Sequence, residues 1–295
     1  MTNANRNAFI GSSDDYAASA VVIFGAGADA TTSYRPGTRF GPAAIRQESY
    51  GIETYSPALG RDLEDVVFFD SGDLEFPFGS PGRQLAAIEE RAAEILADGK
   101  VPFMLGGEHL VTLGAVRAAA RKHPDLRIIH FDAHADLRED YLGESLSHAS
   151  VIRRCHDLLG DGRIFQFGIR SGTREEFAFM KAGHVTAEPF DDTTLDAVIA
   201  SLNSQLSNAR PSNSPMPVYL TIDMDVLDPS EFPGTGTQEA GGFSYLKLLA
   251  DMRKVCRGCR IVGIDNVELN PTLDPSGRSA ALACKFLREE ILELS

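Results

Sequence analysis

Three residues with metal-binding side chains stand at alternate positions near the middle of the chain. The stretch IIHFDAHADL, residues 128–137, places Asp132, His134 and Asp136 directly after an apolar run. Side chains at every second position of an extended chain project to the same side, so these three can converge on one point. Two carboxylates and an imidazole at a buried strand end would be costly without compensation. The spacing therefore favours a divalent cation as their partner.

Similar residues follow two other apolar runs. Ligand sites in open α/β sheets lie beyond the carboxyl ends of the strands, so we expect the three segments to meet there. Two imidazoles and four carboxylates exceed what one catalytic zinc ion uses, and they suit two divalent ions that share bridging carboxylates. With no cysteine in the set, Mn²⁺ is the natural choice, while Ni²⁺, Co²⁺ and Zn²⁺ stay open. The predicted ligands are His109 after VPFMLGGE, Asp132, His134 and Asp136 after RIIHF, and Asp223 and Asp225 around the end of VYLTI.

The other histidines and the paired cysteines receive structural interpretations. His123, His156 and His184 stand in helical or loop contexts, and His130 is expected to face away from the ligand side of its strand. Cys256 and Cys259 form an isolated C-x-x-C. Since no second pair of ligands is obvious nearby, we expect structural thiols there and not a zinc site.

The elements that must position these residues alternate between apolar strands and amphipathic helices. Such alternation predicts a mostly parallel sheet covered on both faces, a three-layer α/β/α architecture in a single domain over residues 19–295. The polar residues 1–18 are expected to form a mobile tail. Strands are predicted over 19–25, 101–107, 126–131, 163–168, 218–223 and 260–265, and helices over 84–97, 110–122, 147–159, 194–206, 245–255 and 279–294.

The glycine-rich turn GAGADA, residues 25–30, does not predict nucleotide binding. A dinucleotide fingerprint needs a third small residue and an immediate helix. Here TTSYRPGTRFGP follows, which is rich in turn residues.

Composition narrows the possible partners. The 295 residues carry 28 Lys and Arg against 42 Asp and Glu, a formal net charge of −14. This excess disfavours binding to nucleic acid or to an anionic membrane, and it suits a small cationic ligand. No apolar run approaches the ~18 residues that a membrane span needs, and the N-terminus lacks a secretory signal. Four cysteines are too few for a disulfide framework in a chain this long, which fits a cytoplasmic location.

Five motifs together make the sequence resemble the ureohydrolase family of arginases and agmatinases, most closely the bacterial agmatinases. The resemblance implies an eight-stranded parallel sheet, assembly as homotrimers or homohexamers, and hydrolysis of a guanidino compound to urea and an amine by a metal-bridging hydroxide. The motifs are TSYRPGTRFGPAAIR (32–46), GGEH (106–109), HFDAHADLR (130–138), LTIDMDVLDPSEFPGTGTQEAGGFSY (220–245) and GIDNVELNP (263–271).

The resemblance also implies roles for individual residues. The six predicted ligands would hold two metal ions, and Asp136 would count among the catalytic residues as well. Glu268 would bind the substrate guanidinium, and His148, in SLSHAS, would carry a proton to the leaving amine. The chemistry is consistent, because a carboxylate pairs well with a planar cation and histidine titrates in a useful range.

Agmatine is the substrate that the resemblance favours. The segment LREDYLGESLS, residues 137–147, lacks the asparagines with which arginases read the amino-acid head of arginine. Glu139, Asp140 or Glu144 could meet the amine end of agmatine. The alternatives are guanidinobutyrate, guanidinopropionate, arginine or guanidine as substrate, a one-zinc deacetylase on the same fold, or an inactive metal-binding regulator.

Four positions depart from the family pattern. Gly27, Gln238 and Ala240 stand where prolines are usual, and Ala135 replaces the threonine common in agmatinases. The departures bear on the loops around the pocket, and therefore on substrate choice.

Overall fold

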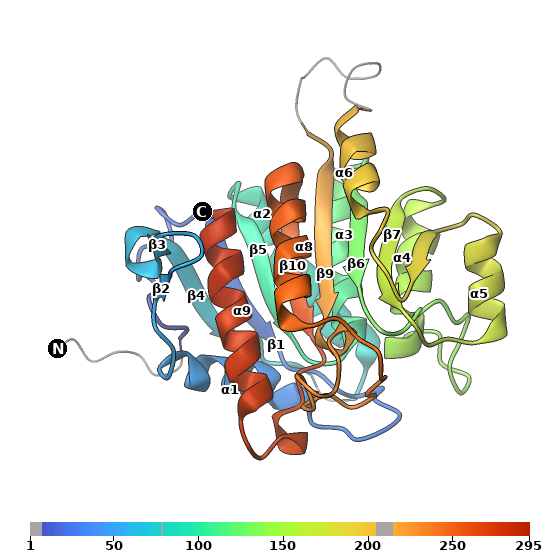
Figure 1. The fold of residues 1–295 in the computed structure, drawn as a ribbon, viewed down its shortest axis with the longest axis horizontal. Helices are drawn as coiled ribbons and strands as arrows, with labels where there is room; N and C mark the ends of the chain where they lie inside the picture. The colour runs from blue at the N-terminus through green and yellow to red at the C-terminus, as the bar shows by residue number, and fades with distance from the viewer. Residues whose placement is uncertain (1–7, 78, 205–214) are drawn as a thin grey trace.

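An eight-stranded parallel sheet forms the centre of the molecule (Figure 1). The computed structural model describes residues 8–77, 79–204 and 215–295. The strand order is β4-β1-β5-β10-β9-β6-β7-β8, and each neighbouring pair runs parallel. The strands are β1 (Val21–Ala26), β4 (Phe68–Asp73), β5 (Val101–Gly106), β6 (Arg127–Phe131), β7 (Ile164–Ile169), β8 (Thr186–Pro189), β9 (Pro217–Asp223) and β10 (Arg260–Val267), and β2 (Tyr55–Ser56) and β3 (Arg61–Asp62) form a separate small hairpin.

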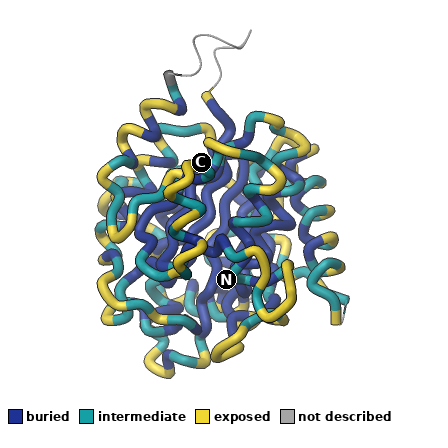
Figure 2. The backbone as a smooth tube through the Cα atoms, turned by 90° about the vertical axis from the view of Figure 1, so that its right-hand side faces the viewer, coloured by how far each residue is buried: buried dark blue, intermediate teal, exposed yellow. Residues whose placement is uncertain are grey.

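Two layers of helices cover the sheet and bury its interior (Figure 2). The residues of one apolar cluster come from α1, α6, α8 and α9, and those of the other from α2, α3 and α4, with α5 packed beside it. The predicted three-layer α/β/α fold is confirmed. The helices are α1 (Gly41–Ser49), α2 (Pro81–Ala97), α3 (Thr112–Lys122), α4 (Val151–Leu159), α5 (Arg174–Lys181), α6 (Leu195–Ser204), α8 (Tyr245–Gly258) and α9 (Arg278–Leu294).

Within the central sheet, the two edge strands are the ones that the apolar pattern does not predict. Every residue of β1 and β9 is buried, whereas β4 and β8 are mostly half-buried or exposed. A strand buried on both faces reads as a continuous apolar run, while an edge strand has no such signature. Helices α1 and α5 were not predicted either. The end of the predicted helix 194–206 lies outside the described residues.

The N-terminal segment differs from the predicted tail in its described part. Phe9 is fully buried, and its backbone N–H donates to Asp70 Oδ2 over 2.8 Å. The ordered structure therefore begins before residue 19, because one aromatic side chain fills a place in the core beside Phe68.

Four central strands bring the predicted ligands to one edge of the sheet. Strands β5, β10, β9 and β6 are consecutive neighbours, and since they run parallel, their carboxyl ends share that edge. The chain segments that follow them must therefore meet. Within the described ranges, no helix is both long and apolar enough to cross a membrane.

Candidate metal centre

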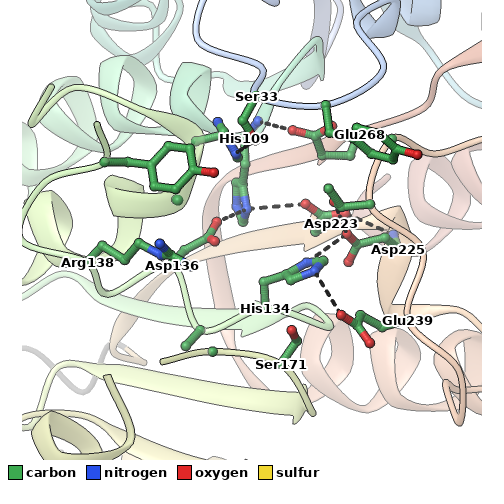
Figure 3. Close-up of a pocket in the computed structure, with 18 of the residues that line it drawn as sticks. Ser33, His109, His134, Asp136, Arg138, Ser171, Asp223, Asp225, Glu239 and Glu268 are labelled. Atoms are coloured by element: carbon green, nitrogen blue, oxygen red, sulfur yellow. Dashed lines mark hydrogen bonds and ion pairs between the residues drawn. The ribbon is translucent and has the colours of Figure 1, made fainter. Parts of the chain in front are cut away.

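The carboxyl ends of these four strands surround a cavity of about 520 Å³ (Figure 3). His109 follows β5, the D-x-H-x-D segment follows β6, and Glu268 follows β10. Asp223 closes β9 and Asp225 lies in the 3₁₀ turn after it. Five of the six predicted ligands line the cavity, and the sixth, Asp132, is fully buried beneath them.

One nitrogen of His109 faces three carboxylates. Its Nδ1 lies 3.0 Å from Asp132 Oδ2, 3.1 Å from Asp136 Oδ2 and 3.4 Å from Asp223 Oδ2. It is nevertheless buried without a well-directed hydrogen bond to any described residue. The contacts with these carboxylates raise the pKa of His109 well above its usual value, so without metal they favour a proton on the imidazole. The nitrogen is placed to act as a metal ligand once an ion takes the place of that proton.

The other ring nitrogen of His109, Nε2, contacts a buried hydrogen-bonded network. Nε2 lies 3.1 Å from the hydroxyl of Thr221, and that hydroxyl donates to Asp265 Oδ1 over 2.6 Å. Tyr219 donates to the second oxygen of Asp265, also over 2.6 Å. Because the Thr221 hydroxyl proton is committed to Asp265, we assign the imidazole proton to Nε2. In the neutral imidazole this leaves Nδ1 without a proton on the side of the carboxylates, the tautomer that metal binding requires.

Asp132 joins two groups of ligands. One of its oxygens faces His109, and the other lies 3.6 Å from Nδ1 of His134. The same His134 nitrogen lies 2.9 Å from Asp225 Oδ2. The arrangement therefore has two subsites that share Asp132, one around His109 and one around His134, as a pair of bridged ions needs.

The four buried carboxylates of the cluster need positive charge close to them. Burial, followed by the charge of Asp132, raises the pKa of Asp136 to about 7. Burial and the neighbouring aspartates raise the pKa of Asp223 well above its usual value. Four carboxylates cannot all ionise in a space this dry, and two divalent ions would balance their four charges.

Glu268 is a buried carboxylate at the same edge. Its Oε1 accepts a hydrogen bond from the backbone N–H of His109 over 2.8 Å. Burial, with Glu108 and Asp225 nearby, raises its pKa to about 8. Among the described residues, no lysine or arginine pairs with it. Its φ is +66°, and that of Asp136 is +52°. Such backbone costs about 1–3 kcal/mol per residue, and it persists where the surroundings impose it, often at functional sites.

His148 lines the cavity at the start of the turn that leads into α4. Its backbone N–H donates to Thr31 Oγ1 over 3.1 Å, and its Nε2 lies 3.4 Å from Ser33 Oγ. The ring packs edge-on against Tyr141. Burial lowers the pKa of His148 to about 4, so the imidazole is neutral at pH 7 and able to accept a proton.

The prediction that His130 faces away from the ligands is wrong. Its Nε2 lies 2.8 Å from Asp132 Oδ2, while the amide of Gln166 donates to its Nδ1 over 3.0 Å and to the Ala135 carbonyl over 2.9 Å. His130 precedes Asp132 by two positions, so the alternation of a strand places both side chains on one side. That spacing was the signal by which the sequence could have revealed this contact.

The acidic residues at the mouth of the cavity are not the ones expected from the sequence. Glu139, Asp140 and Glu144 do not line it, and the carboxylate of Glu139 pairs with Arg153 and Arg154. The carboxylate nearest the ligands from the rim is Glu239, 3.9 Å from Nε2 of His134 (Figure 3). It lies in the loop after β9, and no periodic pattern marks it.

The chain was compared with protein families, curated proteins and solved structures. The model of the arginase family matches residues 19–292. The chain belongs to the arginase family. It is 46% identical to an agmatinase of Bacillus subtilis over 96% of this chain and 95% of that protein. Among solved structures, a proposed agmatinase from Clostridium difficile is 48% identical with a TM-score of 0.88, covering 95% and 99% of the two chains. The agmatine ureohydrolase of Thermoplasma volcanium is 33% identical with a TM-score of 0.87, covering 98% and 94%.

Membership of the arginase family confirms the resemblance seen in the sequence. It implies a binuclear divalent-metal centre, and the two subsites that share Asp132 fit one. The family members here act on guanidino C–N bonds, so the protein is a hydrolase of that class.

Two of the four departures from the arginase-family pattern have a structural counterpart. Gly27 lies in the loop after β1, and a Cβ at this position would lie 2.5 Å from the Arg39 carbonyl oxygen. The backbone around Arg39 therefore leaves no room for proline here. The amide of Gln238 donates to the Pro233 carbonyl and so closes the loop beside the cavity. Ala135 is buried at the cavity wall and Ala240 is exposed, and nothing in the structure explains either.

Proposed function

We propose that the protein is a metal-dependent agmatinase that hydrolyses agmatine to putrescine and urea. The observation that carries this proposal is Glu268, a buried carboxylate with no cationic partner among the described residues, placed beside the six metal-binding side chains. A planar guanidinium would supply the missing positive charge through paired, charge-assisted hydrogen bonds. The agmatinases among the relatives support the same substrate.

The six predicted ligands, which are His109, His134 and the four aspartates around them, would hold the two ions. When bound, divalent ions lower the pKa of water and polarise the group under attack. Asp132 would bridge the ions, because its two oxygens face the two histidines. Asp136 and Asp223 would serve the His109 subsite, and Asp225 the His134 subsite.

Glu268 and His148 would divide the remaining work. Glu268 fixes the guanidinium over the ligands and keeps its carbon in place for attack. Hydrolysis of agmatine, as a dication, gives urea and the dication of putrescine, so both protons of water end on the leaving nitrogen. A neutral His148 at the cavity wall can accept one proton and pass it to that nitrogen.

Release of urea from agmatine tests the proposal. Purified protein loaded with Mn²⁺ should form urea and putrescine in equal amounts, and metal-free protein should form neither. Failure to release urea from any guanidino compound, with metal shown to be bound, would refute it.

A second candidate, guanidinobutyrate, is favoured by two arginines. Arg35 and Arg138 line the same cavity, and each stacks over a tyrosine ring at 4.7 Å, on Tyr34 and Tyr141. A carboxylate tail would pair with these guanidinium groups, whereas the ammonium of agmatine would pair with Glu239. Arg138→Gln separates the two, because it should raise KM for guanidinobutyrate only.

The proposal also covers the native metal, the oligomeric assembly and the cellular location. Oxygen-rich ligands without cysteine favour Mn²⁺. Assembly as a homotrimer or homohexamer and a cytoplasmic location remain predictions, which metal analysis of purified protein, light scattering and cell fractionation would check. An inactive regulator is not favoured, because all six predicted ligands are present.

A further inference from the structure

A second group of metal-binding side chains lies at the opposite edge of the sheet. It consists of His156 in the last turns of α4, Asp161 in the turn before β7, and His184 in the loop before β8. Both loops precede the amino ends of parallel strands, whereas the residues of the candidate metal centre follow carboxyl ends. The two groups are therefore separate, and α4 runs from the turn that holds His148 toward the second group.

Both imidazoles of this group point at one oxygen. Nε2 of His156 lies 2.7 Å from Asp161 Oδ1, and Nδ1 of His184 lies 2.9 Å from the same atom. Two hydrogen bonds to one exposed carboxylate oxygen would be worth little by themselves. Two nitrogens and one oxygen brought to a common point are, however, three of the four ligands that a tetrahedral ion takes.

An aromatic side chain fixes the orientation of both rings. Phe179 of α5 stacks on His184 with ring centroids 4.3 Å apart and meets His156 edge-on at 4.9 Å. Arg153 covers the Phe179 ring at 4.3 Å. Imidazoles held in this way lose little rotational freedom when an ion binds, which is the preorganisation that a ligand set needs.

The third ligand has freedom to adjust. Glycines with φ of +84° and +71° flank Asp161, and Gly183, with φ of +89°, precedes His184. Bonds of about 2.0–2.1 Å from the ion to each ligand would separate the nitrogens from the oxygen slightly more than their present contacts do. A short turn between two glycines allows that shift at small cost.

We propose that His156, Asp161 and His184 form a surface site for a borderline divalent cation, zinc first, with water as the fourth ligand. The ion would tie the end of α4 to the loop that enters β8, and so add a third connection to the hydrogen bonds and ring contacts that join these segments here. Histidine nitrogens with one carboxylate suit Zn²⁺, Co²⁺ or Ni²⁺ better than Mn²⁺, so this site and the catalytic centre would prefer different ions.

Zinc uptake by the folded, Mn²⁺-loaded protein tests the site. Wild type and the variants His156→Gln, His184→Gln and Asp157→Asn are dialysed against increasing zinc, and bound metal is counted by atomic emission. Any exchange at the catalytic centre is common to all four proteins and cancels in the comparison. Asp157→Asn is the matched control, since it removes a neighbouring exposed charge of α4 but no proposed ligand.

Wild type and Asp157→Asn should each bind one more zinc ion per chain than either histidine variant, with saturation well below millimolar zinc. Asp161→Asn should weaken this extra binding at least tenfold. Circular dichroism and urea release before zinc is added check that each variant is folded. Equal zinc content in all the folded proteins, or an extra ion that appears only at millimolar zinc, would show that the three residues form only a hydrogen-bonded pair of turns.

Discussion

Nε2 of His130 donates a hydrogen bond to Oδ2 of Asp132, the oxygen that also faces His109. The amide of Gln166 donates to the other nitrogen of His130, which assigns the proton to Nε2. All of these groups are buried. The carboxylate that we propose as the bridge between the ions is thus held by the residue two positions before it, and this supporting contact makes the first prediction.

Replacing His130 with phenylalanine should lower metal affinity about 10–100-fold, the usual effect of losing a partner that orients a ligand. KM for agmatine at saturating metal should change little, because His130 does not line the cavity in which Glu268 would bind the guanidinium. Metal titration followed by kinetics measures both. His123→Phe is the control for loss of a histidine elsewhere. Unchanged metal affinity in His130→Phe would show that the contact does not support Asp132.

Glu268→Gln should abolish most turnover while metal stays bound. Loss of one partner of a buried charge pair costs about 2–5 kcal/mol, so kcat/KM for agmatine should fall by a factor between about 30 and several thousand. Metal content by elemental analysis should equal that of wild type, since Glu268 is not one of the six proposed ligands and accepts a hydrogen bond from the backbone of His109. Full urea release by this variant would remove Glu268 as the guanidinium anchor.

Asp225→Asn should lower metal content from two ions per chain toward one. Asp225 contacts His134, whereas His109 keeps Asp132, Asp136 and Asp223 around it. Equilibrium dialysis against a series of Mn²⁺ concentrations would show one weak and one unaffected site. Equal loss at both sites would mean that the two subsites are not separable.

Metal affinity should fall as the pH decreases through 7. The pKa of Asp136 is raised to about 7 in the protein without metal, so below that pH a proton occupies the carboxylate and the ion must displace it. Above pH 7 the carboxylate is already ionised, and this competition ends. Metal binding measured between pH 6 and 8 should therefore show release of protons that grows toward the acid end. A flat pH dependence would contradict the assignment of Asp136 as a ligand.

Gly27→Ala should destabilise the fold by about 1–3 kcal/mol, the usual cost of overpacking. The added Cβ would lie 2.5 Å from the Arg39 carbonyl oxygen, and backbone gives way less readily than a side chain. Urea unfolding followed by circular dichroism measures the change. The exposed Ala240 gives the control, Ala240→Gly, which should change stability little. Gly99→Ala would not serve as a control, because the φ of Gly99 is +76° and an alanine there would be strained.

The six central strands could be predicted because they are buried on both faces and read as apolar runs, whereas β4 and β8 are edge strands with mixed residues. The N-terminal residues are mostly polar and so predict a tail, and the pattern does not reveal that one aromatic among them, Phe9, is buried. The ligand set could be predicted because a parallel sheet must gather its carboxyl ends, and so local spacing was enough. The position of His130 also follows from the sequence, because strand alternation places it on the same side as Asp132, two residues later.

The sequence by itself determined the family and the class of reaction and predicted the ligand residues, because these depend on short motifs whose spacing is fixed by the geometry of a strand. The tertiary structure decided which oxygen of Asp132 faces which histidine, that Thr221 and Asp265 support His109, and that Glu239 and not Glu139 lies at the rim. It also brought His156, Asp161 and His184 together around Phe179. These contacts join elements far apart along the chain, and only the packing of helices against the sheet fixes the distances between them.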